Sequence, residues 1–128
     1  MKQIIETHLA PTPIGPYSQA VQAGDILFVS GQIAIDPATN ALINTNITEE
    51  TTCVMKNVEQ LLNKAGYEFA DIVKTTIFLS DMEHFAKVNE VYGTYFNTCF
   101  PARETVAVLG LPKCVNVEIS VTAYKAKS

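Results

Sequence analysis

The last strand-like stretch of the chain reads Val115-Asn116-Val117-Glu118-Ile119-Ser120-Val121-Thr122-Ala123-Tyr124. Successive side chains of a β-strand point to opposite sides, so its odd positions share one face and its even positions the other. The odd face is wholly apolar, whereas the even face is largely polar and carries Glu118. This alternation predicts a sheet with one buried face and an opposite face that is either wet or covered by another subunit.

Two amphipathic helices are predicted to bury the apolar face. The first is expected near residues 48–65, where Thr48 can cap it. Glu49 and Glu50 suit its positive N-terminal end, and Gly66 is a natural stop. Its apolar stripe, at helical spacing, consists of Val54, Val58, Leu61, Leu62 and Ala65.

The second helix is expected to begin after Asp81 and to end in the segment Asn97–Pro101. Its expected inner face consists of Phe85, Val88, Tyr92, Tyr95 and Phe96. The other predicted strands are Lys2–Glu6, Val21–Gly24, Ile26–Ser30, Ile72–Ser80 and Thr105–Leu109, with a hairpin turn at Gly24-Asp25. This order predicts one α+β domain over residues 1–128, with both helices packed on one face of a mixed sheet.

Composition narrows the classes of function. The 128 residues are 48% apolar and carry a net charge of -4, which suits a single buried core and argues against nucleic acid as the main partner. The three cysteines, Cys53, Cys99 and Cys114, are far apart and form no CxxC pair, so neither a disulfide framework nor a metal site is expected. No targeting segment or membrane-spanning run is visible, which favours the cytoplasm, and no nucleotide-binding motif signals a cofactor.

Arg103 is the only arginine beside eight lysines. A guanidinium group offers a planar fork that meets a carboxylate with two hydrogen bonds, which a lysine cannot do. Arg103 follows the second predicted helix in the stretch Phe-Pro-Ala-Arg, at a junction between a loop and a strand. It is therefore a candidate for binding a carboxylate, with a surface arginine or an intersubunit ion pair as the alternative.

Glu118 is a carboxylate within an apolar strand. Partial burial would raise its pKa toward the range that suits a general acid or base, and a solvated strand face is the alternative. Tyr17 follows a proline-rich loop and could reach over a cleft, or could be an ordinary amphipathic tyrosine. Gly31, after Ser30, could let a ligand approach the backbone or mark a bulge, and Asn89 could face inward or face water.

Eight stretches of the chain, in order, resemble the Rid family of reactive-intermediate deaminases, also called YjgF-like or L-PSP proteins. They are Ala10–Pro11, Ile14–Ala20, Phe28–Gln32, Asp71–Thr76, Phe85–Asn89, Phe100–Arg103, Leu111–Lys113 and Val117–Ile119. The resemblance implies a chorismate-mutase-like fold, a homotrimer with clefts between subunits, and hydrolysis of 2-imino acids or their enamine tautomers to 2-keto acids and ammonia. The expected substrates are 2-iminobutanoate and 2-iminopropanoate, and no cofactor is implied.

The resemblance also implies roles for single residues. Arg103 matches the family's carboxylate-binding arginine, and Glu118 matches the glutamate that orients or activates water. The cleft is expected to be lined by Tyr17, Ser30, Gly31 and Asn89, with Thr105 at a pocket position that is cysteine in some members. Tyr17 is grouped with the two catalytic candidates, and the others with substrate binding.

Two departures from the family pattern lie near Arg103. Glu104 stands where the family usually has a small residue, and Leu109 stands where it usually has a small or basic residue. Along a strand Glu104 should point away from the face of Arg103, whereas a strand that began later would let the two side chains pair. The competing functions are an L-PSP-type endoribonuclease or translation inhibitor, a chaperone-like module without enzymatic activity, and a metabolite-binding sensor.

Overall fold

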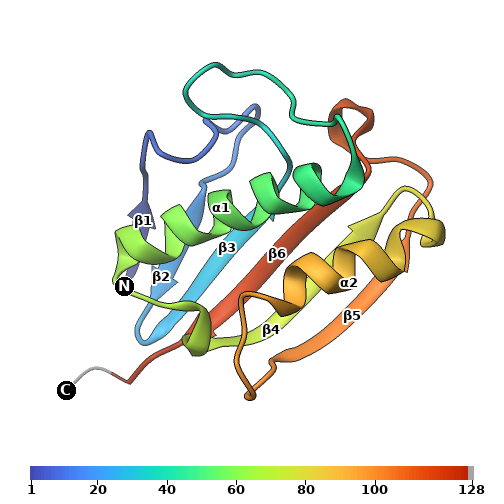
Figure 1. Ribbon diagram of the computed structural model, residues 1–128. Helices are drawn as coiled ribbons and strands as arrows, with labels where there is room; N and C mark the ends of the chain where they lie inside the picture. The colour runs from blue at the N-terminus through green and yellow to red at the C-terminus, as the bar shows by residue number, and fades with distance from the viewer. Residues whose placement is uncertain (127–128) are drawn as a thin grey trace.

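The computed structural model describes residues 1–126, which form a six-stranded mixed sheet with two helices on one face (Figure 1). The strands are β1 (Lys2–Ile5), β2 (Ala20–Ala23), β3 (Ile26–Gln32), β4 (Ile72–Leu79), β5 (Ala102–Ala107) and β6 (Val117–Tyr124). The helices are α1 (Ile47–Ala65) and α2 (Phe85–Gly93), with short 3-10 turns at Phe69–Asp71, Met82–His84 and Pro112–Cys114. The predicted α+β class and layer arrangement are confirmed.

The strand order in the sheet is β1-β2-β3-β6-β4-β5. Only β4 and β5 run parallel, because α2 connects them as a crossover, and every other neighbouring pair is antiparallel. The hairpin between β2 and β3 turns at Gly24, whose φ of 61° is the left-handed conformation that glycine adopts without strain. The strand order makes β5 an edge strand and places β6 near the middle of the sheet.

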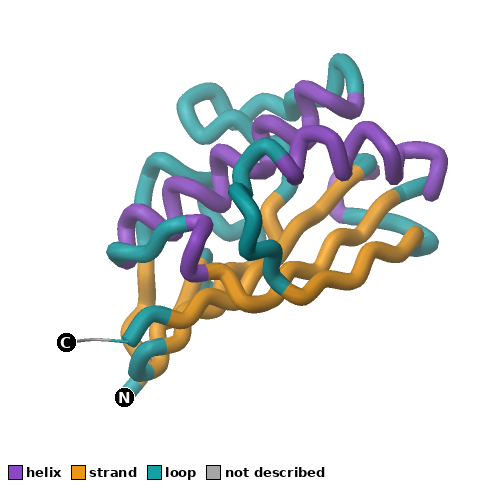
Figure 2. The backbone as a smooth tube through the Cα atoms, turned by 60° about the horizontal axis from the view of Figure 1, so that its bottom comes forward, coloured by secondary structure: helices purple, strands orange, loops and turns teal. Residues whose placement is uncertain are grey.

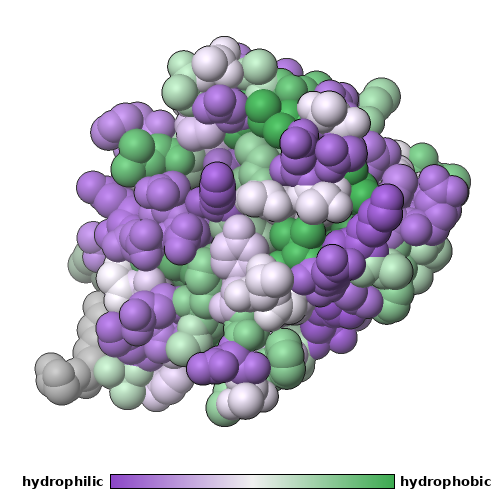
Figure 3. All heavy atoms as spheres, viewed as in Figure 1, coloured by the Kyte–Doolittle hydropathy of each residue, from purple (hydrophilic) through white to green (hydrophobic). Residues whose placement is uncertain are grey.

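Both helices cover the same face of the sheet, and the other face carries no helix (Figure 2). The odd positions of β6 from Val117 to Ala123 are buried beneath the helices, as the alternation predicts. The stripe of α1 at Val54, Val58, Leu61 and Leu62 is also fully buried. The outer surface of the helical layer is mixed, with charged and polar side chains around scattered apolar patches (Figure 3).

The N-terminal end of α1 differs from the prediction. Asn46, not Thr48, caps the helix: its backbone is extended, and its side-chain oxygen accepts a hydrogen bond from the Glu49 N–H at 2.8 Å. Thr48 lies inside the first turn. At the other end Gly66 has a φ of 82° and ends the helix, as predicted.

The predicted second helix is shorter in the structure. The carboxylate of Asp81 accepts from the Glu83 N–H and caps a 3-10 turn, which leads into α2. α2 ends at Gly93 instead of reaching Asn97–Pro101, because glycine and threonine are poor helix formers and the Thr94 hydroxyl donates to the Val91 carbonyl. Tyr95 and Phe96 lie beyond the helix but still pack on the core, beside Phe69.

Several strand boundaries also differ, among them the end of β3 at Gln32 instead of Ser30 and the end of β5 at Ala107 instead of Leu109, and the starts of β5 and β6 matter most for the site. β5 begins at Ala102, three residues before the predicted Thr105, because Ala102 already pairs with Lys74 of β4. β6 begins at Val117 instead of Val115, because Lys113 and Cys114 both adopt left-handed backbone with φ near 55°. Val115 is buried in a separate small cluster with Ile33 and Ile35. The early start of β5 places Arg103 inside a strand.

Candidate active site

Arg103 lies on the helical face of the sheet. It is in register with Thr75 of β4, which is fully buried beneath the helices, and register partners in a sheet point to the same side. Its guanidinium carbon lies 5.1 Å from the ring centroid of Tyr92 and 5.9 Å from that of Phe85, both on α2. The two rings hold the cation by cation–π attraction and fix its direction.

Glu104 points away from Arg103, as expected for the next residue in a strand. Its carboxylate oxygen lies 2.9 Å from the Lys74 amine, on the face without helices. Among residues 1–126, no carboxylate lies within ion-pair distance of Arg103. The guanidinium fork is thus available to an external anion.

A hollow of about 340 Å³ surrounds Arg103, and its walls come from α2 and the loop before β5. The lining residues are Asn89, Tyr92, Gly93, Phe100, Pro101 and Arg103. Within the described chain, the buried side-chain polar atoms that lack a hydrogen-bond partner are Asn89 Oδ1 and Thr105 Oγ1. Thr105 is two residues after Arg103 and shares its face of β5. An unpartnered buried polar atom is costly, so both atoms suit contact with a bound molecule.

Tyr92 is a residue that the sequence analysis assigned only to the core. Its hydroxyl donates to the buried Thr75 Oγ1 at 2.9 Å, which fixes the ring beneath the guanidinium. Burial raises the pKa of this hydroxyl, although Thr75 and the Arg103 charge oppose the shift, so the tyrosine stays neutral. The helical spacing of Tyr92 predicted only that it packs in the core, and no local sequence signal indicated that it also lies against Arg103.

Glu118 lies on the opposite face of the sheet. Its neighbours Val117 and Ile119 are fully buried beneath the helices, so the Glu118 side chain projects from the face without helices. The carboxyl is half-buried, and this loss of solvent raises its pKa above the ordinary value of a glutamate. A carboxylate with a raised pKa is suited to proton transfer near neutral pH.

Gly31 leaves space for this carboxyl where it lies. A Cβ atom at residue 31 would lie 2.7 Å from Glu118 Oε2 and 2.8 Å from its carboxyl carbon, closer than such atoms can approach. The register between β3 and β6 shifts between Val29 and Gln32, so Gly31 sits at an irregularity of the strand. Both sequence interpretations of Gly31, bulge and close approach, therefore apply.

A hollow of about 350 Å³ lies over Glu118, lined also by Ile14, Tyr17, Ser30, Gly31, Ile33 and Pro112. Half of the Tyr17 side chain is exposed, and its hydroxyl oxygen accepts from the Ile14 N–H at 3.4 Å. The loop that carries Tyr17 is anchored by the buried Gln19 amide, which donates to the carbonyls of Thr7, Ala10 and Pro11. The Ser30 hydroxyl donates to the Ser18 carbonyl at 2.6 Å.

The seven predicted site residues therefore form two groups within one chain. Tyr17, Ser30, Gly31 and Glu118 meet on the face without helices. Arg103 and Asn89 line one hollow on the helical face, and Thr105 lies two residues after Arg103 on the same face of the edge strand. The sheet lies between the two groups.

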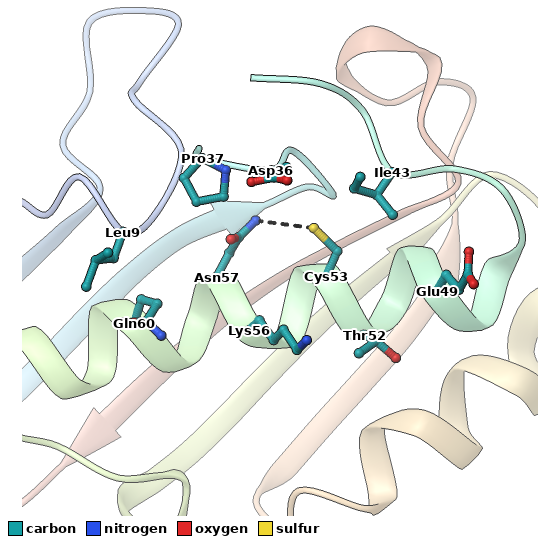
Figure 4. Close-up of a pocket in the computed structure, with 10 residues that line it drawn as sticks. All are labelled: Leu9, Asp36, Pro37, Ile43, Glu49, Thr52, Cys53, Lys56, Asn57 and Gln60. Atoms are coloured by element: carbon teal, nitrogen blue, oxygen red, sulfur yellow. Dashed lines mark hydrogen bonds between the residues drawn. The ribbon is translucent and has the colours of Figure 1, made fainter. Parts of the chain in front are cut away.

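A third hollow, of about 520 Å³, contains none of the predicted residues (Figure 4). It lies between α1 and the Asp36–Ile43 segment, where Asn57 donates to the carbonyls of Ile33 and Ile35. Burial and the nearby Asp36 raise the pKa of the Cys53 thiol, which keeps it a weak nucleophile. Across residues 1–126, no cluster of three potential metal ligands occurs and no helix is long and apolar enough to cross a bilayer.

Comparisons with known proteins point in one direction. The family described as Endoribonuclease L-PSP matches residues 7–125. A RutC family protein of Pyrococcus horikoshii is 50% identical over 98% of this chain and 99% of its own length. The 2-iminobutanoate/2-iminopropanoate deaminase of Mus musculus is 42% identical over 98% of this chain and 93% of its own length. The crystal structure of a Rid family protein from Yersinia pestis superposes with a TM-score of 0.95 at 46% identity, over 98% of this chain and 100% of that chain.

Proposed function

This chain belongs to the Endoribonuclease L-PSP family, which includes the Rid proteins, and on that premise we propose that it hydrolyses 2-imino acids to 2-keto acids and ammonia. The observation that carries the proposal is Arg103, held on two aromatic rings beside two unpartnered polar atoms and with no carboxylate partner in residues 1–126. The name of the mouse relative supports 2-iminobutanoate and 2-iminopropanoate as substrates.

Arg103 binds the substrate carboxylate in this proposal. Two parallel hydrogen bonds from the guanidinium fix both the position and the plane of the carboxylate, which also fixes the adjacent imine carbon. Asn89 Oδ1 and Thr105 Oγ1 are available for further hydrogen bonds to the bound molecule. In this proposal Tyr17, Ser30 and Gly31, which line the hollow over Glu118, form the wall of the site that faces Arg103.

Glu118 serves as the base. It accepts a proton from water as the water oxygen bonds to the imine carbon and the electron pair of the C=N bond moves to nitrogen, and it then returns this proton to the nitrogen to give a carbinolamine. Glu118 next accepts the hydroxyl proton of the carbinolamine and passes it to the amino nitrogen; the C–N bond breaks with its electron pair on nitrogen, the C=O bond forms, and the products are a keto acid and ammonia. The reaction consumes only water, and the raised pKa of Glu118 suits both directions of proton transfer.

A complete site needs more than one chain, because Arg103 and Glu118 lie on opposite faces of the sheet. We therefore propose that the edge of one chain, with Arg103, meets the open face of the next, with Glu118. That face exposes apolar side chains that favour burial against another copy, namely Ile26, Phe28, Val106 and Tyr124. Such head-to-tail contacts close into a ring, and the resemblance to the Rid family indicates a ring of three.

The deaminase proposal is tested by ammonia release from 2-iminobutanoate, generated in situ by threonine dehydratase. Arg103→Ala should reduce the rate to that of the uncatalysed reaction, since it removes the carboxylate contact. Lys74→Ala is the matched control, because it removes a cation from the same pair of strands but on the other face. Full activity of Arg103→Ala would overturn the role given to Arg103.

The shared site is tested by mixing two inactive variants. Arg103→Ala and Glu118→Gln chains are refolded together in equal amounts. Half of the chains then carry an intact Arg103 and the other half an intact Glu118. If the chains assemble at random, about one quarter of the sites should combine the two intact groups and regain activity. Each variant refolded alone is the control. Failure to regain activity, in mixtures shown by mass to exchange subunits, would place both groups in one chain and overturn this assembly.

An endoribonuclease remains the second candidate because the family description names it. The net charge of -4 and the single arginine argue against a groove that binds the phosphates of RNA. RNA cleavage that copurifies with the protein and disappears in Arg103→Ala would favour this candidate. Cleavage that persists in this variant would belong to a contaminant.

A further inference from the structure

Glu50 is a fully buried carboxylate in the first turn of α1, with none of its surface exposed. Its sequence position predicts only a favourable charge at a helix N-terminus, as for Glu49. In the structure, Glu50 Oε2 accepts from the backbone N–H of Asn116 at 2.8 Å, and Oε1 accepts from the Asn116 side-chain amide at 3.0 Å. The Glu50 carboxylate thus binds Asn116 through two hydrogen bonds, one from its backbone and one from its side chain.

Asn116 is held from the other side by the end of β4. The Ser80 N–H donates to the Asn116 carbonyl at 3.0 Å, and the Ser80 hydroxyl donates to its side-chain oxygen at 2.8 Å. The residue is therefore fixed between α1 and β4, immediately before β6 begins. Two residues further along the chain is Glu118.

The turn that precedes Asn116 is strained. Lys113 and Cys114 have φ values of 55° and 56°, a left-handed backbone conformation that is unfavourable for residues other than glycine. The same turn carries Pro112, which lines the hollow over Glu118. Such a turn needs a strong contact at its end, which the Glu50 carboxylate provides.

The chemistry of Glu50 is unusual for a purely structural contact. A buried charge is costly, and an apolar residue of similar size is often as stabilising or more so. The helix N-terminus and two N–H donors compensate this charge, and the carboxylate meets both donors because it presents two acceptors, whereas a glutamine of the same length presents only one.

We propose that Glu50 is a positioning residue for Glu118: its grip on Asn116 fixes the start of β6 and the Pro112 turn, so that the Glu118 carboxyl keeps its place against Gly31. This inference rests on the proposed role of Glu118 as the base. Arg103 is in register with Thr75 of β4, five residues from the Ser80 that contacts Asn116, so Glu50 is expected to act on proton transfer and not on binding of the substrate carboxylate.

The test variant is Glu50→Gln, which keeps the size of the side chain but turns one acceptor toward Asn116 into a donor. The expected result is a kcat lower by about tenfold or more, with a nearly unchanged KM and an unchanged Kd for 2-ketobutyrate. The matched control is Thr51→Val. Thr51 is the next residue of α1 and is equally buried, but its hydroxyl donates only to the Ile47 carbonyl of its own helix.

A second measurement does not depend on activity. The carboxyl carbon of Glu118, observed by NMR and assigned by its loss in Glu118→Gln, reports the pKa directly. Glu50→Gln should lower this pKa toward the ordinary value, because a looser start of β6 admits water to a group whose pKa burial raises. Thr51→Val should leave the titration unchanged.

The outcomes separate the two proposals. An unchanged Glu118 titration in Glu50→Gln, or equal losses of kcat in Glu50→Gln and Thr51→Val, would overturn the positioning role. A wild-type protein without deaminase activity would overturn the proposed function, while the titration would still decide the role of Glu50. If Glu50→Gln does not fold, Asn116→Ala keeps the backbone contact and should give a smaller shift in the same direction.

Discussion

The hollow around Arg103 and the hollow around Glu118 differ in their charged group and in what that group packs against. Arg103 is a permanent charge at an edge strand, held against aromatic faces and flanked by unpartnered polar atoms. Glu118 is a tunable charge near the centre of the sheet, packed against the backbone of Gly31 and partly shielded from solvent. Under the proposed function, the hollow of Arg103 would bind a fixed anion and the hollow of Glu118 would move a proton.

The sharpest test of these two roles is Glu118→Gln. The substitution keeps the shape of the side chain but removes the base, so kcat should fall by about a hundredfold or more. Binding of 2-ketobutyrate, measured by calorimetry, should change little, whereas Arg103→Ala should abolish that binding. Equal losses of kcat and of keto acid affinity in Glu118→Gln would indicate a merely structural glutamate.

Gly31→Ala tests the close contact that holds the carboxyl. The added methyl group would displace Glu118 Oε2, so we expect kcat to fall about tenfold. Gly110→Ala is the control, since no atom lies within 4 Å of a Cβ built there. Activity of Gly31→Ala equal to that of the control would show that the carboxyl moves aside without consequence.

The pH dependence of stability should distinguish the two hollows. Because the pKa of Glu118 is higher in the folded than in the unfolded chain, the folded state retains the proton longer. The contribution of Glu118 to the free energy of unfolding should therefore fall as pH rises from the ordinary glutamate value through the raised one. Glu118→Gln should remove this decline, an effect on the order of 1 kcal/mol or less because half of the carboxyl remains in solvent.

This pH dependence is measured by urea unfolding of the wild-type protein and Glu118→Gln at a series of pH values. Arg103→Ala is the control, since Arg103 lies on the opposite face of the sheet from Glu118 and the decline should persist. A stability difference between the wild-type protein and Glu118→Gln that rises with pH through the same interval would contradict the direction of the Glu118 shift.

The smallest effect is expected for Glu104→Ala. Glu104 pairs with Lys74 on the face opposite Arg103, and an exposed ion pair contributes about 0–1 kcal/mol to stability. Ammonia release should stay within about twofold of the wild-type rate, since the guanidinium contacts are untouched. A large loss of activity would show that Glu104 takes part in the contact between subunits.

Several features of the fold follow from local sequence alone. Alternation in residues 115–124 predicted which side of β6 is buried, and helical spacing predicted the stripe of α1. Gly66 ended α1 as expected, because the left-handed conformation favours glycine. The direction of Glu104 also followed from strand alternation once Arg103 lay within a strand.

Other boundaries depended on contacts that no local pattern contains. Asn46 displaced Thr48 as the cap because its extended backbone brings a short side chain to the Glu49 N–H. β5 began earlier than expected because β4 offered a pairing partner to Ala102. Glu49 and Glu50 look alike in sequence, yet only Glu50 is buried, because the packing of α1 on the sheet fixes which side of the turn faces the core.

The sequence by itself determined the residue types of the site, the one-sided sheet and the helices that cover it. Only the tertiary structure decided that Arg103 and Glu118 lie on opposite faces. Strand alternation gives the relative direction of neighbours within one strand, but the face that each strand presents depends on its register with distant strands. Here Arg103 aligns with the buried Thr75 and Glu118 with Phe78, three residues apart on β4, and that odd separation puts the sheet between them.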